Sequence, residues 1–288
     1  MAAVAGVGWA PQPQAVLWAA AEAELRRVPL LLVHGYGTLP YESGLAEHEL
    51  LGQAARAELD DAVASVARAH PGVAVRALLD PQRPDLVLRE RSMDAAVVVI
   101  GTKTHAAATV EARFGSVAGA LLGSARCPVV AVPPAGVRAQ AVVVAVDGTL
   151  VSQRAVAFAF DAASRRRARL RVVHCWTGSA AGHEHRMLLA EALAGFAERY
   201  PDVEVVDDGC EGHPGTELVR LSRGAALLVV GSHGRDRWAT TVWGSVSRTL
   251  ARQSACPVAV VRAGGPWDVS GPLPGSAWAA DYGIAARS

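Results

Sequence analysis

Cysteine and lysine are scarce in this sequence of 288 residues. The four cysteines include no Cys-x-x-Cys pair, which excludes a scaffold built on disulfides. Cys127 and Cys256 occur in the matching contexts ARCPVVAV and SACPVAVV, so we expect both to be buried where a helix leads into a strand. Lys103 is the only lysine, and the formal net charge of +1 is spread without a basic stripe. This charge distribution argues against a dedicated nucleic-acid-binding protein.

A targeting segment and a long hydrophobic run are also missing. The first residues, MAAVAGVGWAPQPQ, carry no basic leader and are interrupted by Pro11 and Pro13, so they fit neither a signal peptide nor a membrane span. We therefore expect a cytoplasmic protein that does not associate with membranes. With 51% hydrophobic and 19% charged residues, the chain has enough apolar material for two domains, each with its own core.

The sequence contains two copies of one unit. Three pairs of segments match in the same order: 21–36 with 162–176, 94–102 with 224–232, and 115–133 with 244–262. Prolines and a glycine interrupt the apolar pattern at PPAGVRAQ, residues 133–140. We predict a first domain over 1–134, a second over 139–264, and a flexible tail over 265–288, which is rich in glycine and proline.

Short apolar runs alternate with helical stretches in both copies, a pattern typical of a parallel sheet covered by helices. Strands are predicted near 3–7, 29–34, 72–78, 95–101 and 128–132, and near 141–146, 169–175, 203–207, 226–231 and 257–262. Helices are predicted over 47–70, from an N-cap at Ser152 to about Arg165, over 183–200 until Pro201 ends it, over 213–225 with Gly224 closing it, and from Gly244. The longer helix 47–70 accounts for the greater length of the first copy.

Residues 227–245, LLVVGSHGRDRWATTVWGS, combine a buried strand, a glycine-rich loop and the start of a helix. Gly231 and Gly234 follow the strand that ends at Val230, and they allow positive φ and close approach of an anion to backbone N–H groups. Gly244 precedes Ser245, Val246 and Ser247, where a helix start would offer further donors. The pattern predicts a phosphate-binding loop, although two glycines after a strand also occur in ordinary α/β turns.

The spacing of Gly231, Gly234, Gly244 and Ser245 resembles the nucleotide-binding signature of the universal stress protein family, G-x2-G-x9-G-[S/T]. The resemblance covers nearly everything except the tail. It implies an α/β fold of two tandem doubly wound domains, each a five-stranded parallel sheet of order 3-2-1-4-5 flanked by helices. It also implies that CPVVAV and CPVAVV, the fifth strands, pair at the seam of an internal pseudo-dimer. The implied ligand is ATP or a related adenine nucleotide, with Mg²⁺ as an optional companion.

Further site residues follow from the same resemblance. Asp147, at the end of the first strand of the second copy, would hold the adenosine end of the nucleotide, although Asp-Gly is also a common turn. Cys175 would contact adenine through its backbone. His233 and Arg235, on either side of Gly234, would approach phosphate oxygens, with a solvated loop as the equal alternative.

The first copy departs from this pattern. Val7 aligns with Asp147, and Thr104 replaces the inner glycine, which adds a branched Cβ where the backbone should approach phosphate. Gly101 and Gly115 persist, and Lys103 with Ser116 would leave a residual anion site. We therefore predict that the first copy binds nucleotide weakly or not at all.

Other clusters of polar residues carry weaker signals. His183, Glu184 and His185 suggest a metal site, but neighbouring helical positions diverge, so we expect none. His34 and His174 recur at matching strand ends, which favours a structural role. Nucleophile-elbow and HExxH motifs are missing, so we expect no enzyme and at most slow, incidental ATP hydrolysis.

We interpret the sequence as a nucleotide-dependent module for stress response or signalling that acts on an unidentified protein partner. The alternative is a partner-binding scaffold without nucleotide. An enzyme that forms adenylates is a third possibility, against which the missing acceptor pocket argues. Association of two chains into a homodimer stays open.

Overall fold

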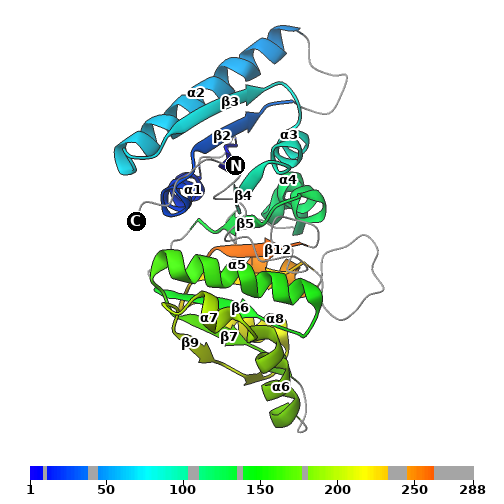
Figure 1. The fold of residues 1–288 in the computed structure, drawn as a ribbon. Helices are drawn as coiled ribbons and strands as arrows, with labels where there is room; N and C mark the ends of the chain where they lie inside the picture. Colours follow the sequence, from blue (N-terminus) through cyan, green and yellow to red (C-terminus); the bar gives the residue numbers. More distant parts are fainter. Residues whose placement is uncertain are drawn as a thin grey trace.

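The computed structural model describes residues 1–8, 12–37, 45–102, 110–134, 139–176, 181–232 and 245–262, which form two successive α/β units (Figure 1). The first unit contains β1 (Ala2–Gly6), α1 (Pro13–Arg26), β2 (Leu30–Gly35), α2 (Leu45–Ala69), β3 (Val75–Asp80), α3 (Pro84–Arg91), β4 (Ala95–Gly101), α4 (Val110–Ser124) and β5 (Val129–Val132). The second contains β6 (Ala141–Ala145), α5 (Leu150–Arg166), β7 (Leu170–Val173), β8 (Cys175–Trp176), α6 (Ala181–Leu193), α7 (Phe196–Arg199), β9 (Val205–Asp207), β10 (Cys210–Glu211), α8 (Pro214–Ser222), β11 (Ala225–Gly231), α9 (Ser245–Gln253) and β12 (Val258–Val261).

The two units share a single ten-stranded sheet, with the order β3-β2-β1-β4-β5-β12-β11-β6-β7-β9. Within each unit the strands are parallel and follow the order 3-2-1-4-5, which confirms the predicted fold class. At the seam β5 and β12 run antiparallel, with Val130 opposite Ala259. The predicted pairing of the two fifth strands is therefore confirmed. Because each strand covers the other, neither unit leaves this edge exposed.

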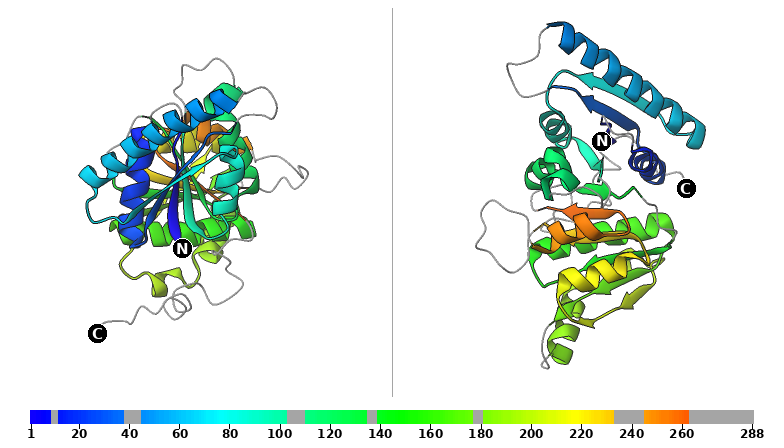
Figure 2. Two further views of the ribbon diagram at one scale, coloured as in Figure 1. Left: turned by 90° about the horizontal axis from the view of Figure 1, so that it is seen from above. Right: turned by 180° about the vertical axis from the view of Figure 1, so that it is seen from behind.

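Helices cover both faces of the sheet (Figure 2). Because successive strand residues point to opposite faces, the valine-rich strands contribute to two cores: Val97 and Val99 join one, and Val98 joins the other. The first core takes residues from α1, α2, α5, α6 and α7, and the second takes residues from α3, α4, α8 and α9. Among the helices of the described ranges, none combines the length and apolar character that a membrane crossing needs.

Most predicted elements are present, and the differences have local causes. Helix α5 is capped by Thr149, not by Ser152, because the Thr149 hydroxyl accepts the Ser152 N–H at 3.2 Å. The helix predicted over 183–200 breaks at Gly195, whose φ of 77° is left-handed. Gly224 directly follows Arg223, the C-cap of α8, as predicted for a glycine that closes a helix, but it is not among the described glycines with positive φ. The strand predicted over 169–175 is divided into β7 and β8 at His174.

Candidate functional site

The first component of the candidate site is the turn that joins β6 to α5. Asp147 Oδ1 accepts hydrogen bonds from the Thr149 N–H at 3.0 Å and from the Thr149 hydroxyl at 2.6 Å. Gly148 has a φ of 78°, a left-handed conformation that glycine adopts without steric cost. The half-buried carboxylate is thus held at the N-terminus of α5, where the helix dipole favours negative charge. Asp147 is therefore a turn residue in this structure, which is compatible with an additional contact to a ligand.

The second component is the end of β11, the strand next to β6. The register pairs Val229 with Val144, so Gly231 and Asp147 lie at the same end of neighbouring strands. A Cβ on Gly231 would approach Val151 Cγ1 at 3.0 Å. Gly231 is not among the described glycines with positive φ, so the left-handed conformation that glycine allows is not used there. Close packing against the first turn of α5 explains this glycine.

Helix α9 begins beside Gly231. The Ser247 hydroxyl donates to the Gly231 carbonyl at 3.2 Å and ties the helix start to the strand end. Helix α9 starts at Ser245, so the first-turn amides of Ser245, Val246 and Ser247 have no acceptor within the helix and are oriented as donors that suit an anion. Val230 itself is 3% exposed, and its side chain belongs to the core. Only its backbone is suited to a site at this end of the sheet.

Cys175 lies on the other side of β6. The Cys210 N–H donates to the His174 carbonyl at 3.0 Å, and the Gly212 N–H donates to the Trp176 carbonyl at 2.8 Å. Backbone groups alternate in direction along a strand, so the N–H and C=O of Cys175 point the opposite way, toward the β6 side. This direction suits the predicted backbone contact. The structure thus brings Asp147, Cys175, Gly231 and the start of α9 to the carboxyl ends of β6, β7 and β11.

Four of the predicted site residues, His233, Gly234, Arg235 and Gly244, lie outside the described residues, and so does the side chain of Ser245. The roles predicted for them stay predictions.

The sequence of this chain is similar to those of known proteins. The sequence profile of the universal stress protein family matches residues 4–133 and 139–262. The chain belongs to the universal stress protein family. A universal stress protein of Mycobacterium tuberculosis strain H37Rv is 35% identical over 288 aligned positions, which cover 90% of this chain and 95% of the relative. One from Mycolicibacterium smegmatis is 33% identical over 271 positions, covering 86% and 92%.

Solved structures agree on the fold. The crystal structure of a universal stress protein from Archaeoglobus fulgidus superposes with a TM-score of 0.70 at 18% identity, and it covers 90% of this chain and 96% of that chain. A second, described as a universal stress protein from Pseudomonas aeruginosa, reaches a TM-score of 0.56 at 14% identity, covering 90% and 91%. At these identities the likeness concerns the fold alone.

The first universal stress domain lacks the carboxylate of the second. The Val7 N–H donates to the Val33 carbonyl as the Val146 N–H donates to the Val173 carbonyl. Val7 is therefore the counterpart of Val146, and the alignment of Val7 with Asp147 is wrong by one position. The counterpart of Asp147 is Gly8, which also provides no acceptor side chain.

Two further features distinguish the first universal stress domain. The Gln12 side chain fills the space in front of Gly101, since a Cβ on Gly101 would lie 1.4 Å from Gln12 Oε1. Helix α4 begins at Val110, so Gly115 and Ser116 lie inside it, whereas α9 begins at Ser245, directly after Gly244. The residual anion site predicted at Ser116 required a helix that starts there. This prediction is wrong, because Ser116 lies inside α4, where backbone amides are already hydrogen-bonded within the helix. Lys103 and Thr104 lie outside the described residues.

A histidine cluster of this universal stress protein was missed from sequence. His174 Nδ1 and His185 Nδ1 are 3.2 Å apart, and His185 Nε2 is 2.9 Å from Asp207 Oδ1. Trp176 packs against both imidazoles. In the part of the chain that the structure describes, no three His, Cys, Asp or Glu residues are placed to hold a metal ion. His185 thus contacts His174 after β7 and Asp207 on β9, and the structural role predicted for His34 and His174 stays a prediction.

Proposed function

We propose that the second domain binds ATP or a related adenine nucleotide and that occupancy of this site controls an interaction with a protein partner in stress response or signalling. One observation carries the proposal: a carboxylate, an outward-facing stretch of backbone and a helix start meet at the carboxyl ends of β6, β7 and β11. In doubly wound sheets ligands bind at this edge, where the strand order changes direction.

Each component matches one part of a nucleotide. An ionised carboxylate offers several lone pairs beyond those that bond Thr149, so Asp147 can accept from a ribose hydroxyl or the adenine amino group. The backbone of Cys175 can pair with the edge of the adenine ring. The amides of Ser245, Val246 and Ser247 suit phosphate oxygens, and Mg²⁺ would accompany the phosphates as an optional ion.

The proposed activity is binding, and we expect any ATP hydrolysis to be slow. The first domain serves as a structural partner, because Gln12 occupies the space in front of Gly101 and Gly8 replaces the aspartate. We therefore propose one nucleotide for each chain. The expected location is the cytoplasm, where ATP is abundant.

Isothermal titration calorimetry with ATP tests the proposal on matched variants. We expect wild type to bind with a stoichiometry of one, and Asp147→Ala to bind about tenfold more weakly or worse, because a hydrogen bond to a charged group is lost. Thr149→Val is the control: it removes the hydroxyl that bonds Asp147 and caps α5 but keeps the carboxylate and its bond from the backbone N–H of residue 149, so its affinity should stay within about threefold of wild type. Failure of wild type to bind at millimolar ATP would contradict the proposal and favour the scaffold without nucleotide.

A further inference from the structure

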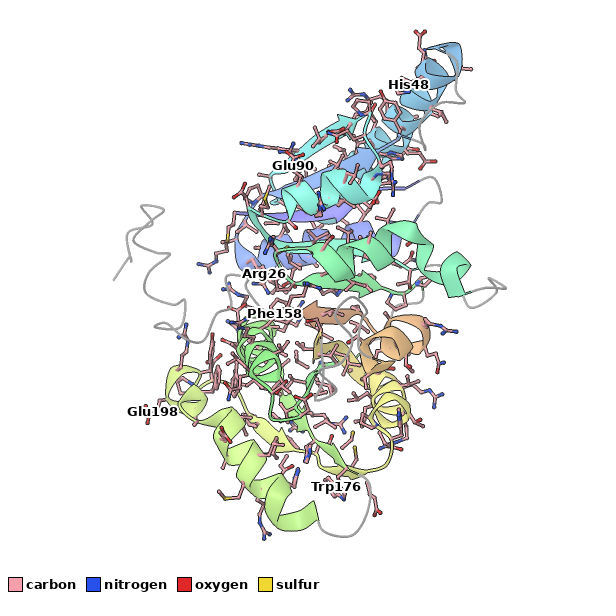
Figure 3. The ribbon with its side chains drawn as sticks, turned by 90° about the vertical axis from the view of Figure 1, so that its right-hand side faces the viewer. Arg26, His48, Glu90, Phe158, Trp176 and Glu198 are labelled. Carbon is pink, nitrogen blue, oxygen red and sulfur yellow. The ribbon has the colours of Figure 1, made fainter. Side chains whose placement is uncertain are left out.

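Two cysteines face each other at one end of the second domain. Cys175 on β8 and Cys210 on β10 are opposite residues in a short parallel ladder, and their Sγ atoms are 2.7 Å apart. Trp176, the neighbour of Cys175, marks this end of the molecule in Figure 3. Cys175 and Cys210 are both half-buried residues, whereas Cys127 and Cys256 are 2% and 0% exposed. Four free cysteines thus divide into two enclosed ones and one half-buried pair.

We propose that Cys175 and Cys210 are a redox modification site: a low-molecular-weight disulfide oxidises them to an intramolecular disulfide that fastens β8 to β10, and thiols reverse it. The backbone suits this bond. Neighbouring strands lie roughly 4.8 Å apart, inside the range of roughly 4.4–6.8 Å that Cα atoms of a disulfide span. Opposite residues of one ladder also place their Cβ atoms on the same face, so no strand has to shift.

The surroundings assign different roles to the two sulfurs. Burial raises the pKa of both thiols, and Glu217 adds to this effect. The contact between the thiols further raises the pKa of Cys175 but lowers that of Cys210, and Cys175 is also the more deeply buried of the two. Cys210 is therefore the first to ionise and the attacking sulfur, and Cys175 is the resolving one.

The exchange balances in two steps. The Cys210 thiolate attacks one sulfur of the small disulfide, forms a mixed disulfide and expels one small thiolate. Cys175 then loses its proton and attacks the Cys210 sulfur, which forms the protein disulfide and expels the second small thiolate. The two cysteines lose two electrons, the small disulfide gains them, and the two protons go to the two leaving thiolates.

The proposal does not depend on nucleotide binding, because it rests on the sulfur geometry alone. A bond at this position would nevertheless fix the backbone of Cys175, whose N–H and C=O point toward the β6 side. Failure of one proposal therefore leaves the other standing, and the experiment is performed without nucleotide.

The full-length native protein is incubated with oxidised glutathione, alkylated, digested and mapped by mass spectrometry without reduction. We expect one crosslinked peptide pair joining Cys175 to Cys210, lighter by two hydrogens and reversed by dithiothreitol. Cys127 and Cys256 serve as internal controls and should be alkylated only after denaturation. The rate should increase from neutral to alkaline pH, since the thiolate is the attacking species.

Two single variants test the order of the steps. Cys175→Ser lacks the resolving sulfur, so we expect glutathione to remain attached to Cys210 as a stable mixed disulfide. Cys210→Ser lacks the attacking sulfur and should be modified at least several-fold more slowly. Crosslinks between chains, glutathione retained on wild type, or thiols that stay reduced in excess oxidised glutathione would each overturn the proposal.

Discussion

The guanidinium of Arg26 in the first domain lies 5.1 Å from the centroid of the Phe158 ring in the second domain (Figure 3). The reciprocal contact places the Arg166 guanidinium 5.6 Å from the centroid of the Trp18 ring. Arg26 and Arg166 close the last turns of α1 and α5, and the two aromatic residues precede them by the same number of positions. The duplicated helices therefore exchange equivalent contacts across the seam, as expected for a pseudo-two-fold interface.

Acidic residues break this symmetry. Glu22 is fully buried and pairs with Arg26 at 2.6 Å and also with Arg166. Asp161 pairs with Arg26 at 3.1 Å and with Arg165 at 2.8 Å. The junction of the domains is thus a buried charge network, in which loss of one member leaves an opposite charge uncompensated.

Replacement of Arg26 by alanine should destabilise the protein strongly. Glu22 would remain buried and keep its ion pair with Arg166 but lose the one with Arg26, and we expect a loss of about 3–5 kcal/mol in the free energy of unfolding. Urea denaturation followed by circular dichroism measures this loss. The control is Arg169→Ala, which breaks the Arg169–Glu204 pair, whose side chains are 69% and 61% exposed. A loss below about 1 kcal/mol is expected for the control, and similar losses for both variants would contradict the role of burial.

Acid should weaken the junction through Glu22. Burial opposes ionisation of this carboxyl, but the charges of Arg26 and Arg166 outweigh it and hold its pKa below the ordinary value of 4.5. The stabilisation is fully present above pH 4.5 and is lost as the pH falls from 4.5 through the lowered pKa, because the unfolded chain binds the proton first. In Glu22→Gln the free energy of unfolding should change less steeply over this window. Parallel curves for the two proteins would refute the assignment.

Substitution of Gly209 by alanine should disturb the histidine cluster. A Cβ there would approach the His185 ring and Trp176 at 2.8 Å, so at least one ring must move, at a cost of about 1–3 kcal/mol. Gly72→Ala is the matched control, because nothing lies within 4 Å of its Cβ position. Thermal unfolding should show a lower Tm for the first variant and an unchanged or higher Tm for the second. Equal Tm values for the two variants would contradict this prediction, because they would show that the rings of His185 and Trp176 can move without loss of stability.

Glycine at position 167 should stabilise the protein. Arg167 caps α5 with a left-handed φ of 49°, which costs an ordinary residue roughly 1 kcal/mol, and its side chain is exposed. Arg167→Gly should therefore raise the free energy of unfolding by up to about 1 kcal/mol. Arg223→Gly provides the contrast, since Arg223 caps α8 with a right-handed φ of −65° and is also exposed. Arg223→Gly should therefore lower the free energy of unfolding. Urea denaturation measures both variants, and a change of the same sign in both would contradict this explanation.

The duplicated fold could be predicted because its signals are local. Apolar runs such as AAVVVIG in β4 and AALLVVG in β11 are too short for helices and too apolar for exposed strands. Their recurrence in the same order exposed the repeat. Helix boundaries were less accurate: the capping residue of α5 depends on which hydroxyl meets a free amide, and the break at Gly195 depends on backbone torsion.

Local sequence signals predicted only some of the residues of the candidate site. Asp147 and Gly231 were found because each follows an apolar strand, but the alignment of the first copy slipped by one residue where no periodic pattern constrains a turn. Cys210 was missed because its partner Cys175 is 35 residues away. One signal was present: both cysteines follow strands that are neighbours in the order 3-2-1-4-5, and parallel neighbours end at the same edge.

By itself the sequence determined the repeat and the α/β class, since these follow from hydrophobic periodicity, while the order of the strands was implied by its resemblance to the universal stress protein family. Only the tertiary structure decided which side chains meet: Gln12 over Gly101, Arg26 over Phe158, and Cys175 against Cys210. The physical reason is that each of these contacts joins residues from separate elements. The distance between such residues is set by how the sheet and its helices pack, and local sequence patterns do not predict that distance.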